Sequence, residues 1–321
     1  MCDSMLHDVR RTGTARPTGR APSSSNAPAS SRRTIRVAVL ARLVLVAAAG
    51  AGGARAATSV VQSGAALSIR GDAAANTVLV TGQSFVGRVA VRIDGGDVLE
   101  FAAVRDVRVD LKGGDDRVSF LGVRIGGSVS VRGGAGADEV RIAGEDFVLG
   151  PPGVFIGGDV DVRLGNQPGD RMRIDSRADR GTVIGGSLRI IGASSVLLDG
   201  NGGGSGFQVG DVLIGRDLRL QSRIECQANL EDVNVCGRTK LALGDGDDRI
   251  AVSKCFFAGK FTVHLSGGDD RLDLDDTSSD GIEFDSLFDI DGGPGVDVLD
   301  QNPANHFNAS SGRISGIEST T

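Results

Sequence analysis

The sequence predicts an all-β fold, a right-handed parallel β-helix, in which the chain winds as a β-solenoid. Three observations lead to this prediction. Short runs alternate apolar with polar residues, as strands do when one face is buried. Glycine-rich turns separate these runs, and glycine accounts for 49 of the 321 residues. The same phrase recurs along the chain, as expected when each repeat forms one coil.

The interval of the repeat sets the size of a coil. Residues 123–142 show one repeat most clearly, because they hold three alternating runs separated by two glycine-rich turns. An aspartate closes one of the turns in each repeat, and Asp248 and Asp270 are 22 residues apart. We therefore predict three strands and about 22 residues per regular coil.

The first 56 residues predict an export signal. A basic lead precedes an apolar run from Val37 to Gly50, and Ala54-Arg55-Ala56 follows. These are the parts of a secretory signal peptide, and the apolar run is too short to span a bilayer. We predict cleavage after Ala56 and a secreted, periplasmic or cell-surface product without a membrane span. The general secretory and twin-arginine routes both stay open.

The remaining chain divides into three segments. Residues 57–105 are predicted to form an N-terminal rung and a hairpin cap, residues 106–300 the solenoid, and residues 301–321 a C-terminal cap. The hairpin is predicted from two alternating runs around Gly95-Gly96. A cap is expected because a terminal coil would otherwise expose an unpaired strand edge.

The alternation also predicts which side chains fill the core. Longer spacings place extra residues in loops at Glu145–Gly153, Asp175–Gly181 and Gly200–Gly210, where we expect any binding face. The residues expected to face inward are Val129, Val131, Val140, Ile142, Leu241, Leu243, Val263 and Leu265, and those expected to face outward are Ser130, Arg141, Ala242 and His264.

The charge of the chain limits its partners. The sequence has 35 basic and 41 acidic residues, and the first 56 hold nine Arg and two Asp. Removing them leaves 26 basic and 39 acidic residues, a net charge near −13. An acidic protein repels phosphate backbones and anionic membranes, so we expect no nucleic-acid partner.

Two segments carry a known repeat pattern. Gly133-Gly134-Ala135-Gly136-Ala137-Asp138-Glu139-Val140-Arg141 and residues 292–300 fit G-G-x-G-x-D-x-U-x. This pattern resembles the haemolysin-type (RTX) calcium repeat, and the wider unit resembles bacterial exported β-solenoid proteins. The resemblance implies calcium bound between successive turns. Other turns, such as residues 113–116, are interpreted as a shortened form, Gly-Gly-Asp-Asp.

The candidate calcium ligands are aspartates that share one repeat position. Stacked carboxylates suit Ca²⁺, which takes six to eight oxygen ligands. The alternative is that each aspartate bonds backbone N–H groups of its own turn. We expect the second role to dominate, with no cofactor required for stability. The aspartates are Asp116, Asp138, Asp248, Asp270 and Asp297.

Three cysteines follow the predicted signal. In an oxidising compartment two of them can pair, provided that their Cα atoms come within about 7 Å. We predict a disulfide between Cys226 and Cys236, which flank a short segment, and a buried Cys255 in the core.

The sequence favours a non-catalytic function. It shows no set of nucleophile, base and orienting group, and it has no Trp or Tyr to stack on sugar rings. We expect an exported surface or matrix module, structural or adhesive, whose partner is a cell-envelope or extracellular polysaccharide or protein. Two alternatives stay open, a calcium-binding RTX-like protein and a carbohydrate-active β-helix enzyme.

Overall fold

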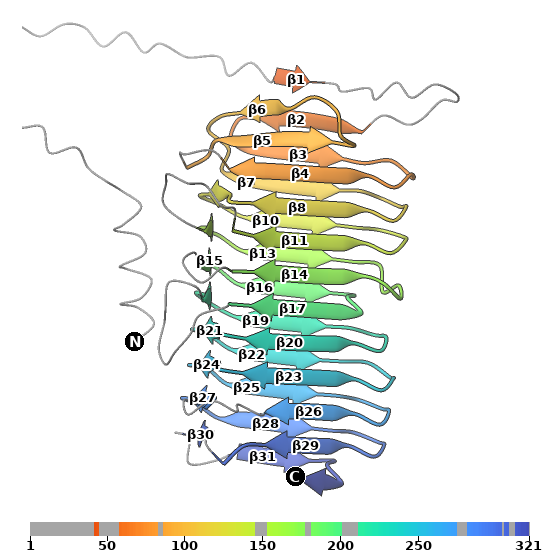
Figure 1. The fold of residues 1–321 in the computed structure, drawn as a ribbon, viewed down its shortest axis with the longest axis vertical. Coiled ribbons are helices and arrows are strands. Elements are labelled where there is room, and N and C mark those ends of the chain that lie inside the picture. Colours follow the sequence, from red (N-terminus) through yellow and green to blue (C-terminus); the bar gives the residue numbers. More distant parts are fainter. Residues whose placement is uncertain are drawn as a thin grey trace, which may run out of the picture.

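The described part of the chain is built of β-strands. The computed structural model describes residues 42–44, 58–82, 86–144, 153–176, 181–200, 211–274, 281–303, 305–307 and 312–320. Within these ranges the chain contains strands, turns and bends but no helix, and the strands form three long sheets, named A, B and C (Figure 1). None of the described residues belongs to a helix that could cross a membrane.

The sheets interleave along the chain. Sheet A contains β1 Arg42–Val44, β2 Ser59–Ser63, β3 Ala66–Arg70, β7 Asp106–Asp110, β10 Val129–Arg132, β13 Val160–Arg163, β16 Leu188–Ile191, β19 Leu218–Gln221, β22 Thr239–Ala242, β25 Phe261–His264, β28 Phe288–Asp291 and β31 Gly312–Ser315. Sheet B contains β4 Thr77–Gly82, β5 Val89–Ile93, β6 Leu99–Phe101, β8 Arg117–Leu121, β11 Glu139–Ala143, β14 Arg171–Asp175, β17 Ser195–Asp199, β20 Gln227–Glu231, β23 Arg249–Ser253, β26 Arg271–Leu274, β29 Val298–Gln301 and β32 Ser319–Thr320. Sheet C contains β9 Arg124–Ile125, β12 Val154–Ile156, β15 Thr182–Ile184, β18 Val212–Ile214, β21 Val233–Val235, β24 Phe256–Phe257, β27 Glu283–Phe284 and β30 His306–Phe307.

One coil takes one strand from each sheet. After β8 in sheet B the chain passes through β9 in sheet C and β10 in sheet A, and then returns to sheet B as β11. Strands β8 and β11 pair in parallel, with Arg117 opposite Glu139. Every described strand pair that includes β7 or a later strand is parallel. The long parallel sheets are consistent with the predicted β-solenoid.

The N-terminal end of the stack pairs differently. Strand β2 pairs antiparallel with both β1 and β3, and β5 pairs antiparallel with both β4 and β6. The runs predicted as a hairpin around Gly95-Gly96 are β5 and β6, and Val89, Val91 and Phe101 are buried there. Strand β1 falls within the predicted signal peptide, whose other residues lie outside the described ranges.

The opposite end continues the three sheets. Strands β30, β31 and β32 each add one strand to sheets C, A and B in the segment predicted as a C-terminal cap. Ile314 on β31 is 43% exposed, although its partner Ile290 on β28 is buried.

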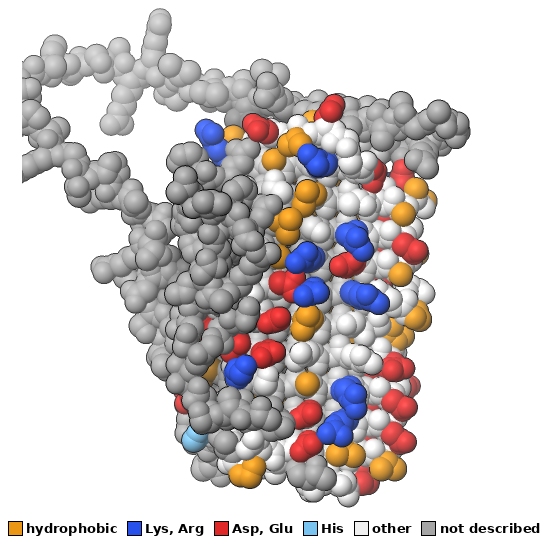
Figure 2. Space-filling view, in the orientation of Figure 1, with side chains coloured by type: hydrophobic (Ala, Val, Ile, Leu, Met, Phe, Trp, Pro, Cys, Tyr) orange, Lys and Arg blue, Asp and Glu red, His pale blue; other side chains and the backbone are white. Residues whose placement is uncertain are grey.

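The core is a stack of apolar side chains inside the coils. All eight residues predicted to face inward are buried, and the four predicted to face outward are partly exposed. Three inward rings, Phe257, Phe261 and Phe284, pack with centroids 4.7 to 5.5 Å apart. The outer face of sheet B, seen in Figure 2, instead carries charged side chains among scattered apolar ones. Alternation thus separates core from surface along most strands of sheets A and B, as predicted, whereas β15, β18 and β21 of sheet C are buried at every position.

We expect Leu243→Asp to unfold the protein. Leu243 is 4% exposed, and its backbone N–H donates a hydrogen bond to the carbonyl of His264 in the next coil. An unpaired charge in this apolar stack costs several kcal/mol. The matched control is Ala242→Asp, which places the same charge on the outer face one residue earlier. Circular-dichroism melts should show a large loss for the first variant and little change for the second. A wild-type melt for Leu243→Asp would show that the inward register is wrong.

Candidate functional site

A column of buried carboxylates follows the turns between sheets A and B. Each predicted calcium ligand lies directly before a strand of sheet B and is at most 2% exposed. Its Oδ1 accepts a hydrogen bond from the backbone N–H of the equivalent residue one coil earlier. The Asp138 Oδ1 atom lies 3.1 Å from the nitrogen of Asp116, and Asp270 Oδ1 lies 2.8 Å from that of Asp248. The aspartates therefore connect successive coils, rather than bonding only within their own turns.

The column extends beyond the five predicted residues. Asp170 Oδ1 accepts the N–H of Asp138 at 2.9 Å, and Glu318 Oε2 accepts that of Asp297 at 2.7 Å. Cys226 occupies an equivalent position, since its N–H donates to Asp248 Oδ1 at 2.7 Å. The 22-residue interval could have identified Cys226, because it precedes Asp248 by 22 residues.

The predicted disulfide between Cys226 and Cys236 is wrong. Cys226 is a free thiol and is fully buried, because its place in the aspartate column encloses the side chain within the coil. Burial, with a smaller contribution from the charge of Asp248, raises the pKa of this thiol to about 12. Cys255 is 3% exposed, and its Sγ lies 3.1 Å from the carbonyl oxygen of Ser253. The prediction that Cys255 is a core residue is confirmed.

The second oxygen of each predicted aspartate is enclosed. Among the described residues, the Oδ2 atoms of all five have no hydrogen-bond partner. A Cβ atom built on Gly133 would lie 2.1 Å from Asp138 Oδ2, so the carboxylate fills the space that this glycine leaves. Burial, reinforced by neighbouring carboxylates and opposed by the backbone N–H bond, raises the pKa of Asp138 and Asp270 to about 6 and that of Asp116 and Asp248 to about 7.

We expect this donor set to hold a proton rather than calcium. A calcium ion takes six to eight oxygens. In the column one oxygen of each aspartate already accepts a backbone N–H, and within the described ranges no three His, Cys, Asp or Glu side chains converge as a metal site. A proton on Oδ2 would remove a buried charge without needing further ligands.

The turns are not shortened, contrary to the interpretation from the sequence. Gly113 is bridged to Ala135, and Arg117 is paired with Glu139, in parallel register. The segment ending in Gly-Gly-Asp-Asp116 therefore aligns residue for residue with the full motif ending at Asp138. What differs between the two turns is residue type, since Lys112 has a positive φ of 74° where the full motif has glycine.

We predict that calcium leaves the stability unchanged. A ligand at a hundred times its dissociation constant stabilises the folded state by about 2.7 kcal/mol, which would raise the melting midpoint by several degrees. Melting curves in millimolar calcium and in excess chelator should coincide, because one oxygen of each aspartate already accepts a backbone N–H and a proton can neutralise the other. A calcium-dependent rise that Asp138→Ala or Asp270→Ala abolishes would contradict this and favour the RTX-like alternative.

We predict that the fold is more stable in mild acid than at pH 8. The folded pKa values of about 6 to 7 lie above the ordinary value of 3.8, so the folded state binds more protons than the unfolded state. The resulting stability is fully present below about pH 4 and is lost as pH rises through 6 to 7. The double variant Asp116→Asn, Asp248→Asn should flatten the dependence of the melting midpoint on pH.

The control for this test is Asp115→Asn. Asp115 is exposed in the same turn, and its Oδ1 also accepts a backbone N–H, that of Ala137 at 2.9 Å. This variant should keep the wild-type pH dependence. Equal slopes for wild type and the double variant would rule out the buried column as the source.

A second polar ladder lies on the turns between sheets C and A, and the sequence did not lead us to expect it. Ser128 N–H donates to Asp106 Oδ1 at 2.9 Å, Asp159 N–H to Ser128 Oγ at 3.1 Å, and Ser187 N–H to Asp159 Oδ1 at 2.8 Å. The available signal was a short polar residue directly after each Ile-Gly-Gly. A Cβ on Gly158 would lie 2.4 Å from Ser128 Oγ, which explains why the last residue of this Ile-Gly-Gly is glycine.

The three predicted loops start from one corner of the solenoid. They connect sheet B to sheet C, between β11 and β12, between β14 and β15, and between β17 and β18. Residues 145–152, 177–180 and 201–210 of these loops lie outside the described ranges. The strands on either side are neighbours in both sheets, so the insertions leave three successive coils side by side.

Acidic side chains gather at the base of these insertions. Asp175, Asp199 and Glu231 are in register on β14, β17 and β20. Asp211 and Asp232, at the same corner, are 3% and 4% exposed. Burial is the main cause that raises the pKa of Asp232 to about 6 and that of Asp199 above its usual value, and neighbouring carboxylates add to both shifts.

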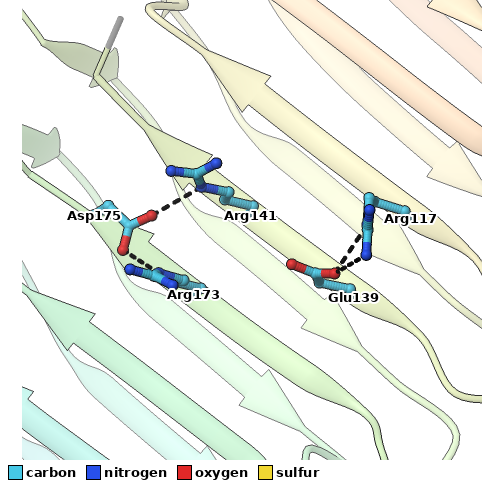
Figure 3. A network of polar contacts seen from close by, with 5 residues as sticks. All are labelled: Arg117, Glu139, Arg141, Arg173 and Asp175. Carbon is cyan, nitrogen blue, oxygen red and sulfur yellow. Dashed lines mark hydrogen bonds and ion pairs between the residues drawn. The ribbon is translucent and has the colours of Figure 1, made fainter.

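Basic side chains on the outer face of sheet B border this corner (Figure 3). Asp175 pairs with Arg141, whose Nε lies 2.8 Å from Oδ2, and with Arg173. Nearer the aspartate turns, Arg117 pairs with Glu139 at 2.8 Å. Part-exposed ion pairs of this kind contribute little stability, so the network mainly organises the surface.

A depression of ≈ 330 Å³ lies on the side of the aspartate turns. Its lining includes Asp115, Arg117, Glu139 and Arg171 but no aromatic ring. It therefore does not provide the carboxylates beside an exposed Phe that a sugar-cleaving site would favour.

Comparisons of the chain with protein-family models, with curated proteins and with solved structures find no match. The function therefore has to be inferred from the geometry of the molecule itself.

Proposed function

We propose that this chain is an exported, non-catalytic β-solenoid that acts as a surface or matrix module. The insertions at the corner between sheets B and C contact its partner. The observation that carries this proposal is the common origin of the three insertions on successive coils. Carboxylates at their base favour a partner that is neutral or positively charged, such as a neutral polysaccharide or a basic protein surface of the cell envelope or extracellular matrix.

The scaffold proposed for this role is a right-handed solenoid of about 22 residues per regular coil. The 22-residue separation of Arg117 and Glu139, which pair in register, supports this coil length. We further propose that β2 and the β5–β6 hairpin cap the N-terminal end, because their antiparallel pairing stops the parallel stacking there. Export through the predicted signal, residues 1–56, completes the proposal.

Precise loop excision tests the binding role. Strand β20 connects to β21 through Asp232 alone, and β17 and β18 are in register with these two strands. Deleting residues 200–210 leaves Asp211 as the same one-residue link. Deleting 144–152 and 176–180 likewise leaves Gly153 and Gly181 as single links. The triple deletion should keep the wild-type circular-dichroism melt but no longer sediment with washed cell envelopes of the producing organism or with insoluble peptidoglycan.

The matched control removes a loop three coils away. Deleting residues 276–280, between β26 and β27, leaves Asp273 and Glu283 as far apart in sequence as their register partners Ala251 and Phe256 on β23 and β24. This variant should sediment like the wild type. Undiminished binding by the triple deletion, or equal loss in the control, would contradict the proposed site.

The acidic corner gives a second candidate function, a carbohydrate-active enzyme. Two carboxylates with raised pKa values, Asp199 and Asp232, are the kind of pair that general acid–base chemistry uses. Release of new reducing ends from the polysaccharide, lost in Asp232→Asn, would favour this candidate over the adhesive one.

A further inference from the structure

The outer face of sheet A carries a cationic strip that spans five neighbouring strands, β10 to β22. Arg189, Arg219 and Lys240 lie directly opposite one another on β16, β19 and β22. Arg132 and Arg163 are likewise opposite each other on β10 and β13. The cationic strip is defined as Arg132, Arg163, Arg189, Arg219 and Lys240.

The cationic strip is largely unbalanced within one chain. Asp161 is the one acidic residue in the outward positions of these five strands, and it pairs with Arg163 at 2.9 Å. Within the described residues, no carboxylate lies at ion-pair distance from Arg189, Arg219 or Lys240. The Nε of Arg189 is enclosed without an acceptor. Like charges opposite each other destabilise a sheet, so an external anion would relieve this repulsion.

An acidic strip with the same repeat runs along another edge. Glu225, Asp247 and Asp269 are exposed on the turns between sheets A and B, each 22 residues after the last. Figure 2 shows acidic side chains gathered along this edge, on the right of the view. One oxygen of Asp247 accepts the N–H of Asp269 at 3.0 Å, and Asp269 accepts that of Val296 at 3.0 Å. These bonds hold the carboxylates of Asp247 and Asp269 in position, and each of the two carboxylates keeps a second oxygen available.

Both strips repeat once per coil, about 4.8 Å along the axis. We propose that the cationic strip on sheet A binds the acidic strip of a second copy of this chain, so that solenoids associate side by side. Three cations in direct register would then face three carboxylates of matching period. At physiological salt, charges more than about 8 Å apart are screened, so local complementarity outweighs repulsion between acidic copies.

The two strips are different surfaces, so the contact is heterologous. A heterologous contact that does not close into a ring adds copies without limit, which produces an open lateral array. The inference does not rest on the adhesive role of the corner between sheets B and C, because it uses other faces of the molecule. Either role can fail while the other stands.

Charge exchange between two variants tests the pairing. Sedimentation velocity of the wild type in about 0.15 M salt should show a coefficient that rises with protein concentration. About 1 M salt should reduce it to the monomer value, because the Debye length falls from about 8 Å to about 3 Å. Arg219→Glu, Lys240→Glu should stay monomeric, and so should Asp247→Lys, Asp269→Lys. An equimolar mixture of the two variants should associate again, since each then offers the charge that the other lacks.

The control is Arg92→Glu, which reverses an exposed charge on β5 and should associate like the wild type. Circular-dichroism melts of all variants verify that they are folded. A wild type that stays monomeric in 0.15 M salt at all concentrations, or a mixture that fails to associate, would overturn the proposal. So would a monomeric wild type whose sheet A binds polygalacturonate, because the cationic strip would then serve a polyanion.

Discussion

The structure depends on the hydrogen bond between equivalent backbone groups of successive coils. Inside the sheets this bond is the ordinary parallel ladder, but a turn would interrupt it and leave buried N–H groups without acceptors. Aspartate and serine side chains supply the missing acceptors, on the turns between sheets A and B and between sheets C and A. The turns must therefore stack as closely as the strands. Gly136 illustrates the requirement, because a Cβ there would lie 2.2 Å from the carbonyl oxygen of Gly114, and its φ is 123°.

This stacking changes the meaning of the aspartates. In sequence they look like calcium ligands, since acidic side chains recur with glycines at a fixed interval. In the fold one oxygen of each carboxylate accepts a hydrogen bond from a backbone N–H. The second oxygen is enclosed against the turn, where water does not reach it. The column therefore combines a stabilising hydrogen bond with an unfavourable buried charge. The balance between these two terms is set by protonation, and it links the stability of the fold to pH.

A solenoid also turns each outward position into a row. A residue type that recurs at one position in several coils produces a line of like charges about 4.8 Å apart. On sheet A this gives the cationic strip, along the aspartate turns the acidic strip, and at the corner between sheets B and C the acidic base of the insertions. Rows of this kind cannot neutralise themselves within a face, so they favour contacts with other molecules that carry opposite charge.

The sequence by itself determined the strands, the inward columns and the aspartate column. Each follows from a local repeat, and residues such as Val263, Leu265 and Asp270 keep their place in it wherever the coil length is regular. Only the tertiary structure decided which residues become neighbours where the coils differ in length. Arg189, Arg219 and Lys240 are 30 and 21 residues apart in sequence, yet they are in register because the insertion between β17 and β18 absorbs the difference. The same alignment put Cys226 in the aspartate column instead of in a disulfide, and it brought three insertions to one corner. Alternation fixes which side of a strand a residue faces, whereas only the stacking of coils fixes which residues become neighbours.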